Sequence, residues 1–296
     1  MPKELTHWIL AEQALQRLGE GPVKRTVQED RHIYYAGAVL PDTLLHIFRG
    51  PYDPAARTLA NRFHDAHGNS YLPIIRAEAA FPHGIPPKLM ACILGVLSHM
   101  QADMVLHPFV YAHSGKGDIG KHYRLETAID VRFLRRGLKP PAHRLTQLVN
   151  KDREVLLEAT ALLFDPERTL PRQALEHALA LHCRFQGMYS RPAWKLAAKA
   201  LARVVGPPFR EQQHLFYPLT RRGGGTTGGD GETWHCPVTG DPHSASIEEL
   251  SDQVVERTAA LFTRIESTGS LAAALHDPPG GNLLTGRHGV GQSHMR

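Results

Sequence analysis

Cysteine is scarce in this sequence of 296 residues. Its three cysteines, Cys92, Cys183 and Cys236, show neither the paired spacing of a zinc ribbon nor the dense, even pattern of a disulfide-stapled secreted domain. The N-terminus also lacks the charged and then apolar layout of a secretory signal. These absences indicate a reducing compartment, and we expect the protein to be cytoplasmic.

Long apolar runs are missing too. No stretch reaches the roughly 18 apolar residues that a membrane-spanning helix needs, so we predict no transmembrane segment. Alternating apolar and polar runs bounded by turn signals are few, which favours an all-α fold over one with a sheet. The sequence contains no Gly-x-Ser-x-Gly elbow, no Gly-Lys-Ser/Thr phosphate loop and no dinucleotide-binding fingerprint, so the enzyme classes built on these motifs have little support.

The hydrophobic content of 42% is enough for one sizeable core. We predict a single helical bundle domain with a multinuclear metal site in its core, followed by a flexible C-terminal tail. The expected boundaries are a helical domain at 1–221, a Gly-rich linker or loop at 222–232, a loop and helix packing on the bundle at 233–270, and a disordered tail at 271–296.

Apolar periodicity and helix-ending residues locate the expected helices. The segment 33–52, which contains Asp42, has Gly and Pro around a short apolar run and is predicted to be irregular. The segment from 86 to 107 is apolar on all sides, which is typical of a buried helix, and Pro108 is expected to end it. The other predicted helices span 3–18, 54–66, 121–136, 142–164, 171–204 and 246–266.

Histidine is abundant, with 19 residues against 29 Asp plus Glu. His99, Asp103 and His107 recur every four residues on the otherwise apolar helix, so they share one face. Burying an unpaired carboxylate costs several kcal/mol, and a metal ion is one of the few partners that can compensate it. The stripe therefore favours a metal site, although structural hydrogen bonding between Asp and His is an alternative.

A second pair, His122 and Glu126, has the same spacing of four residues on the next helix. Imidazole nitrogen and carboxylate oxygen are ligands that suit zinc. Two helices that each present such a face can enclose a metal site in a bundle core. Taken alone, this pair also fits an exposed ion pair on a helix surface.

The order of these residues resembles the zinc-dependent phospholipase C family, whose superfamily includes the three-zinc single-strand nucleases. The resemblance covers roughly residues 5–130. Family members use an N-terminal His, an Asp in a short loop, a His after a helix, a His-x-x-x-Asp helix, a further His and a His-x-x-x-Asp/Glu helix. This chain offers, in that order, His7, Asp42, His64, His99, Asp103, His107, His122 and Glu126.

The resemblance implies how these residues share two or three zinc ions. One zinc takes Asp42, His64 and His99, a neighbouring zinc takes His7, and Asp103 bridges the two. Another zinc takes His107, His122 and Glu126. Asp42 is also implied to activate water, as a catalytic residue.

The chain departs from the secreted relatives in two ways. Their mature N-terminal Trp gives its amine and carbonyl to a zinc, whereas six residues precede His7 here. The interval from Asp103 to His107 is also shorter, so His113 is an alternative ligand to His107. We prefer His107 because it stays on the helix face.

The net charge of +5 could favour anionic partners. The main hypothesis is a hydrolase that cleaves a phospholipid or another phosphodiester with metal-activated water and makes peripheral contact with a membrane. A single-strand nuclease is second, with Tyr34, Tyr35 and Phe81 as possible base-stacking residues. A non-catalytic helical interaction protein is the remaining alternative.

Overall fold

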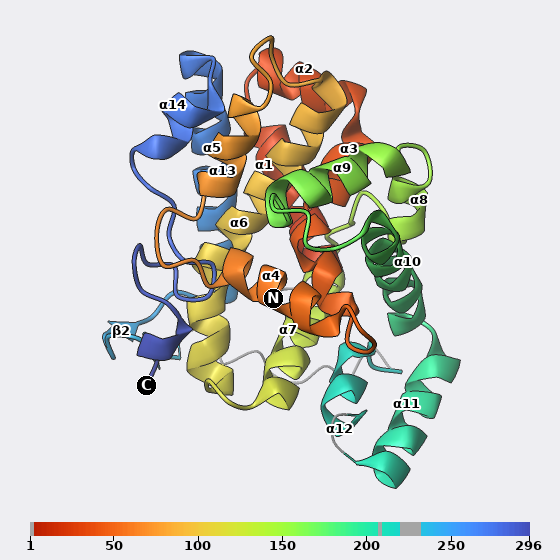
Figure 1. Cartoon of the computed structure of the whole chain (residues 1–296). Coiled ribbons are helices and arrows are strands. Elements are labelled where there is room, and N and C mark those ends of the chain that lie inside the picture. Colours follow the sequence, from red (N-terminus) through yellow and green to blue (C-terminus); the bar gives the residue numbers. More distant parts are fainter. Residues whose placement is uncertain (1–2, 207–208, 220–231) are drawn as a thin grey trace.

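The computed structural model describes residues 3–206, 209–219 and 232–296, and most of these residues are helical (Figure 1). The predicted all-α class is confirmed. The helices are α1 Glu4–Arg17, α2 Pro22–Glu29, α3 Arg31–Gly37, η1 Leu40–His46, α4 Asp53–His64, α5 Leu72–Ala79, α6 Pro87–Ser114, α7 Ile119–Arg135, α8 Leu145–Val149, α9 Arg153–Phe164, α10 Arg172–Tyr189, α11 Pro192–Val205, α12 Phe209–Gln212, η2 Gln213–Leu215, α13 Ile247–Thr268, α14 Leu271–His276 and η3 Gln292–His294, where η marks a 3-10 helix. A short antiparallel hairpin pairs β1 Trp234–His235 with β2 Pro242–His243.

Helix α6 is the central element of the bundle and packs against α1, α3, α7 and α13. By length and hydropathy α6 could cross a membrane, but 94% of its most apolar stretch is buried inside the protein. It is the one helix with these properties in the described part of the chain. Its burial among other helices and its ionisable residues identify α6 as the core helix that the sequence predicted.

Helices α3 and α6 approach each other so closely that glycine is required on both. A Cβ atom on Gly37 would lie 2.3 Å from the carbonyl oxygen of Cys92, and one on Gly95 would lie 2.1 Å from that of Tyr34. No side chain fits at these distances, so the two backbones are in direct contact. This contact places the start of η1, which carries Asp42, next to the polar face of α6.

The expected end of this helix at Pro108 is wrong, because α6 continues to Ser114. A proline inside a helix removes the N–H that would bind the carbonyl four residues earlier, here that of Met104. The C-terminal segment packs against this carbonyl at Gly286. Phe109 and Val110 beyond the proline are buried in the core, and this packing outweighs the local cost of the proline.

Two long predicted helices are each divided in two. The segment 142–164 forms α8 and α9, and the segment 171–204 forms α10 and α11. The second division follows from Pro192, the first residue of α11, which restricts Arg191 to an extended backbone conformation. The predicted gap between 164 and 171 is confirmed, and within it the carboxylate of Asp165 accepts hydrogen bonds from the main chain of Thr169 and Leu170.

The prediction of a disordered tail at 271–296 is wrong. This segment contains α14 and η3, and the side chains of Leu271, Leu275 and Leu283 are fully buried. Sparse periodicity suggested disorder, but hydrogen bonds with His64, Asp65 and His107 hold the segment in place. Residues 222–231 of the predicted Gly-rich linker lie outside the described residues.

Candidate metal centre

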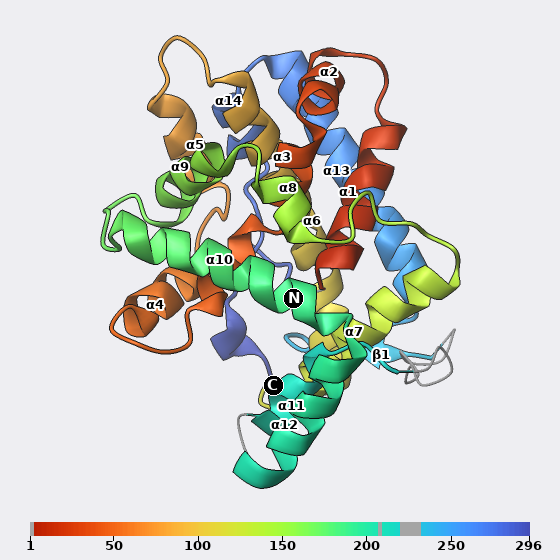
Figure 2. The same ribbon diagram turned by 90° about the vertical axis from the view of Figure 1, so that its right-hand side faces the viewer.

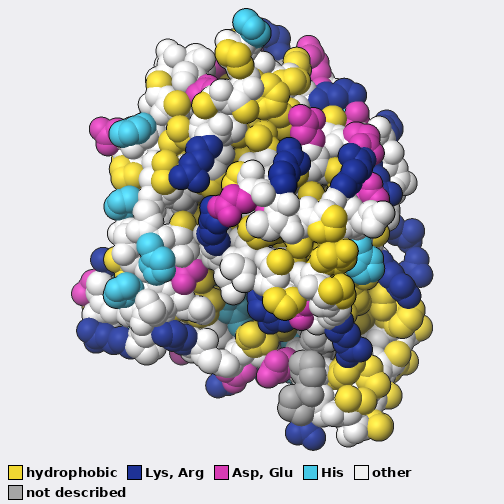
Figure 3. All heavy atoms as spheres, viewed as in Figure 1, with side chains coloured by type: hydrophobic (Ala, Val, Ile, Leu, Met, Phe, Trp, Pro, Cys, Tyr) yellow, Lys and Arg dark blue, Asp and Glu magenta, His cyan; other side chains and the backbone are white. Residues whose placement is uncertain are grey.

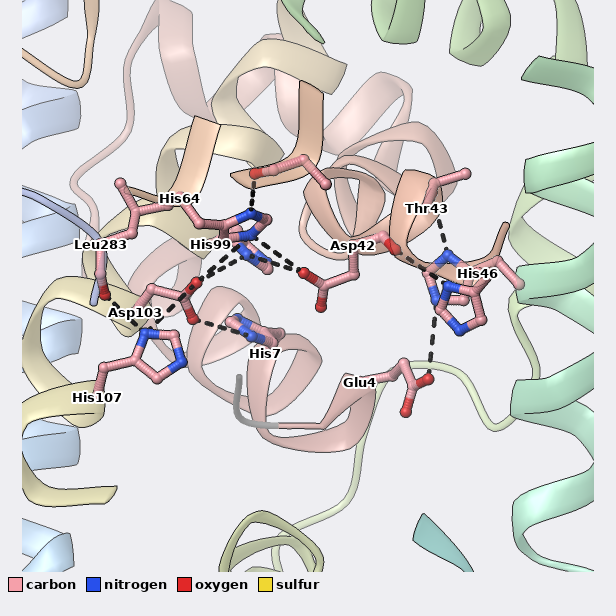
Figure 4. A network of polar contacts seen from close by, with 12 residues as sticks. Glu4, His7, Asp42, Thr43, His46, His64, His99, Asp103, His107 and Leu283 are labelled. Atoms are coloured by element: carbon pink, nitrogen blue, oxygen red, sulfur yellow. Dashed lines mark hydrogen bonds and ion pairs between the residues drawn. The ribbon is translucent and has the colours of Figure 1, made fainter. Parts of the chain in front are cut away.

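Three polar residues spaced four apart on one face of α6 form the middle of the candidate centre (Figure 4). His99, Asp103 and His107 are all fully buried. Oδ2 of Asp103 lies 3.1 Å from Nε2 of His99 and 3.8 Å from Nδ1 of His107. The stripe that the sequence predicted therefore faces the protein interior with its carboxylate between two imidazoles.

Helix α1 adds His7 to this face. Its Nε2 lies 3.5 Å from Oδ1 of Asp103, and its ring stacks on that of His99 with the centroids 4.0 Å apart. One donor atom from each of His7, His99 and Asp103 lies within 4.8 Å of the others. Ligands of one zinc ion, each about 2.0–2.2 Å from the metal, are separated by distances of this order.

A second group contains Asp42 from η1, His64 from the last turn of α4, and His99. Oδ1 of Asp42 lies 3.3 Å from Nε2 of His64 and 3.6 Å from Nε2 of His99. Asp103 borders this group as well, since its Oδ2 lies 4.0 Å from Nε2 of His64. The two oxygens of Asp103 thus face different groups, as a carboxylate that bridges two ions would.

A third group joins α6 to α7 through His107, His122 and Glu126. Nε2 of His122 lies 2.9 Å from Oε1 of Glu126, and the rings of His107 and His122 have centroids 5.9 Å apart. All three side chains are buried, which excludes the alternative of an exposed ion pair for His122 and Glu126.

Main-chain carbonyls orient three of the imidazoles. Nδ1 donates a hydrogen bond to a carbonyl oxygen in each case: His64 to Ala60 at 2.8 Å, His99 to Ala38 at 2.9 Å, and His107 to Leu283 at 2.6 Å. A carbonyl only accepts, so Nδ1 carries a proton in each ring and Nε2 is the nitrogen that faces the site. Histidines that bind metals are commonly held in this way.

Several polar atoms that point into the centre make no hydrogen bond, although they are buried. They are both ring nitrogens of His7, Nε2 of His64, His99 and His107, Oδ1 of Asp42 and both carboxylate oxygens of Asp103. Leaving such buried groups without hydrogen bonds costs about 1–3 kcal/mol each. A cation shared among them would remove this cost, so the donor set fits zinc.

Burial keeps most of the imidazoles neutral. It lowers the pKa of His7 to about 3 and that of His107 to about 4, and it lowers the pKa of His122 well below its ordinary value. Neutral imidazole is the form that binds a metal. These three histidines therefore offer a lone pair without first losing a proton.

His99 and Asp103 behave as a charged pair in the absence of metal. Burial disfavours the imidazolium of His99, but the carboxylates of Asp103 and Asp42 outweigh burial and raise the pKa of His99 to about 9. Burial alone would raise the pKa of Asp103, yet His99 and His107 hold it well below its usual range. The centre therefore contains carboxylates that stay ionised at neutral pH.

The structure brings all eight residues expected as ligands into three adjoining groups. Their role as ligands stays a prediction. The structure also distinguishes His107 from His113, the alternative ligand on α6. His107 belongs to the third group. His113 instead packs its ring on Phe109 and donates from Nδ1 to the carbonyl of Phe109. The sequence did not identify Leu283, whose carbonyl orients His107, because a main-chain carbonyl leaves no signal in residue type.

A family model for zinc dependent phospholipase C matches residues 6–171, which is more than half of the chain. This range contains all eight expected ligands. Searches among curated proteins and among solved structures found no significant match. The order of the eight expected ligands and the family match agree, and the chain belongs to the zinc-dependent phospholipase C family.

Proposed function

We propose that this protein is a phosphodiester hydrolase that uses zinc and cleaves phospholipids in the manner of a phospholipase C. The observation that supports this most directly is the position of Asp103. Its two oxygens face His7 on one side and His64 and His99 on the other, so neighbouring cations could share this carboxylate. Two closely spaced ions are the usual device for hydrolysing phosphate diesters.

The three groups of residues would together hold two or three zinc ions, as the family resemblance implies. Asp103 joins the sites that contain His7 and His64, while Glu126 belongs to the third. Bound zinc lowers the pKa of water toward 7 and neutralises charge that develops on phosphate oxygens. The buried histidines and carboxylates supply a site with little competing water.

Asp42 is placed to act on the attacking water. Its side chain is 14% exposed, whereas that of Asp103 is fully buried, so Asp42 is closer to the substrate side of the centre. Burial would raise the pKa of Asp42, but His99 and His64 lower it to about 2. We propose that Asp42 orients the attacking water or removes its proton.

Cleavage of a phospholipid by this reaction breaks the bond between phosphorus and the glycerol oxygen. The water oxygen forms the new bond to phosphorus, and the products are diacylglycerol and a phosphorylated headgroup. The proton released by water balances the one gained by the glycerol oxygen. The chain's contribution is to hold the reacting groups in fixed positions.

Single-stranded nucleic acid is a weaker candidate for the substrate. Tyr34 is fully buried and Tyr35 is 4% exposed, so neither ring can stack on a base. The expectation that these two residues form a stacking surface is wrong. Both rings pack in the core near α1, where the Tyr34 hydroxyl donates to the carbonyl of Ala11.

Helix α11 supports a lipid substrate and peripheral contact with a membrane. With α12 it forms the lower end of the molecule in Figures 1 and 2, and hydrophobic side chains gather there in Figure 3. Val204 is 86% exposed and Leu196 is 56% exposed, and the basic residues Lys199 and Arg203 lie on the same helix. A helix with exposed apolar residues and cations is typical of binding to the surface of an anionic membrane.

Helices α11 and α12 pack on each other, and α12 also packs on α7 near the candidate centre, with Glu211 next to Gly120, two residues before His122. We also propose that the protein acts in the cytoplasm. Its three cysteines are free, as expected in a reducing compartment, and the cytoplasmic leaflet is anionic, which suits the cations of α11.

The function can be tested by measuring zinc content and hydrolysis together, with untagged protein. Asp103→Asn should lose most of the bound zinc and all measurable hydrolysis of phosphatidylcholine. Asp42→Asn should retain more zinc than Asp103→Asn, yet lose at least about 100-fold in turnover, as general acid–base and positioning groups commonly contribute. Asp130→Asn is the matched control, because Asp130 is fully buried but hydrogen-bonded to Thr6 and Tyr217, outside the centre.

Three outcomes would count against the proposal. Full activity and full zinc content in Asp103→Asn would exclude this centre as the catalytic site. Faster hydrolysis of single-stranded DNA than of phosphatidylcholine vesicles would favour the nuclease alternative. Wild-type protein without bound zinc, even after incubation with the metal, would favour the non-catalytic interaction protein.

A further inference from the structure

A fourth group of possible ligands lies apart from the eight residues described above. Glu4 in α1, His46 in η1 and His182 in α10 each offer one donor atom, and these atoms lie within 4.8 Å of one another. In Figure 4 Glu4 and His46 lie on the other side of Asp42 from His7 and His99. The group therefore needs an explanation separate from the candidate centre.

His182 is the member whose surroundings are least satisfied. It is fully buried, and its Nδ1 lies 3.1 Å from Oγ1 of Thr43, within hydrogen-bond distance. Its Nε2 makes no hydrogen bond. The nearest carboxylate oxygen, Oε1 of Glu4, is 3.7 Å away, which is too far for a hydrogen bond but suits two ligands of one metal ion.

His46 is oriented in the same way as the histidines of the candidate centre. Its Nδ1 donates to the carbonyl oxygen of Asp42 at 3.0 Å, so its Nε2 carries the lone pair. The ring of His46 stacks on that of His182, with the centroids 4.1 Å apart. Two imidazoles with anchored Nδ1 atoms thus lie side by side next to a carboxylate.

We propose that Glu4, His46 and His182 bind a further zinc ion, distinct from those of the candidate centre. Two imidazole nitrogens and one carboxylate oxygen are a common zinc donor set. The two ring planes are only 16° apart, so we expect the rings to tilt toward a common point when the ion binds. The ion would satisfy the unpaired Nε2 of His182.

The further ion would help to fix the position of Asp42. The 3-10 helix η1 carries Asp42 toward the candidate centre, while His46 and Thr43 of the same helix face His182. Binding at this group would tie η1 to α1 and α10, elements distant in sequence. Asp42 would then be held from both sides, by His64 within the centre and by the ion through His46.

Another cluster of similar residues, formed by Asp30, His32 and Asp152, already has hydrogen-bond and ion-pair partners. Nε2 of His32 lies 2.7 Å from Oδ2 of Asp152, and Nζ of Lys88 donates to Oδ1 of the same residue at 2.6 Å. The cluster is partly exposed, and a lysine already neutralises its carboxylate. It provides a control of similar composition in which no ion is expected.

Zinc stoichiometry tests the proposal without reference to activity. Untagged protein would be stripped with a chelator, reloaded with zinc chloride, freed of loose metal and measured by mass spectrometry. His182→Gln and Glu4→Gln should each bind one zinc per chain fewer than the wild type. His32→Gln should bind as much as the wild type. Equal stoichiometry in wild type and folded His182→Gln would overturn the proposal.

A measurement on the wild-type protein guards against variants that fail to fold. Anomalous diffraction on either side of the zinc absorption edge should give a peak between Glu4, His46 and His182, besides the peaks of the candidate centre. Peaks at the centre without one at this position would overturn the proposal. Since neither experiment measures hydrolysis, a catalytically inactive protein could still confirm the further site.

Discussion

Nδ1 of His107 lies 2.6 Å from the carbonyl oxygen of Leu283, which follows it by 176 residues in the chain. The N–H of Leu283 in turn donates to the carbonyl of His64 at 3.1 Å. One residue of the C-terminal segment therefore contacts two expected zinc ligands that come from different helices. The side chain of Leu283 is fully buried, which anchors this arrangement.

Replacing Gly286 should detach this C-terminal segment and weaken the third metal group. Gly286 has φ +70°, and a Cβ there would lie 2.4 Å from the carbonyl oxygen of Met104. Gly286→Ala must therefore push the segment away from α6, displacing Leu283 from His107. We expect a clear loss of thermal stability and of zinc content, measured on the same samples.

Gly289→Ala is the matched control. Gly289 has a similar φ of +72°, but the nearest atom to its Cβ position is the carbonyl oxygen of His67 at 3.9 Å. This variant pays only the backbone cost of the left-handed conformation, about 1–2 kcal/mol. If both variants lost the same stability and zinc, close packing at Gly286 would not be what orients His107.

Gly95→Ala should disrupt the contact between α3 and α6 and, with it, the orientation of His99. The added methyl group would lie 2.1 Å from the carbonyl oxygen of Tyr34, and overpacking of this kind costs about 1–3 kcal/mol. Moving α3 would also weaken the hydrogen bond from His99 to Ala38. Denaturant unfolding and zinc content are the measurements. Gly187→Ala, in α10 where a Cβ meets no atom within 4 Å, should instead be neutral or stabilising by about 0.5–1 kcal/mol.

Zinc affinity should increase with pH because of His99. Its pKa is raised from 6.5 to about 9, and zinc must displace its proton, so the apparent dissociation constant should fall about tenfold per pH unit between pH 7 and 9. The stability of the metal-free protein should change in the opposite sense. The contribution of protonated His99 is fully present below pH 6.5 and is lost as the pH rises through 9.

Chelator competition for the zinc-loaded protein and thermal melts of the stripped protein would measure these two effects. The histidines with lowered pKa values, His7 and His107, are neutral throughout this range and add no slope. An affinity that does not vary between pH 7 and 9 would show that His99 is neutral in the metal-free centre.

Introducing negative charges on α11 should weaken membrane binding without affecting catalysis. Val204→Asp combined with Leu196→Asp should weaken binding to anionic phospholipid vesicles more than tenfold, a loss of about 1.4 kcal/mol or more, because both exposed side chains become charged. Vesicle sedimentation measures binding. Hydrolysis of a soluble, short-chain phosphodiester should not change.

Leu72→Asp is the control for this experiment, since Leu72 is 40% exposed but lies on α5, away from α11. If it weakened vesicle binding as much as the α11 variant, the effect would reflect general surface hydrophobicity. Loss of activity on the soluble substrate in the α11 variant would indicate damage to the centre instead.

The stripe on α6 shows how much of the centre could be predicted from residue spacing alone. The spacing of His99, Asp103 and His107 determines that they share a helix face, because the periodicity of the α-helix is a property of the backbone. The same holds for His122 and Glu126 on α7. The capping box of Ser246 and Glu249 likewise predicts the start of α13, and the structure confirms it.

The order of the eight expected ligands, read against a family pattern, also indicated which of them belong together. By itself the sequence therefore determined the all-α class, the buried helix, and the shared helix faces of His99, Asp103 and His107 and of His122 and Glu126. Side-chain chemistry and helical spacing are local properties, so they can be recognised without any tertiary contact. His7, Asp42 and His64 were expected as ligands only through the family resemblance.

Only the tertiary structure decided how these pieces meet. That His107 rather than His113 belongs to the centre, that Leu283 orients it, and that the C-terminal segment is ordered all depend on contacts between residues far apart in the chain. A main-chain carbonyl is the same in every residue, and Gly286 fits α6 only because of its position against Met104. Such contacts arise from packing, which short-range periodicity does not encode.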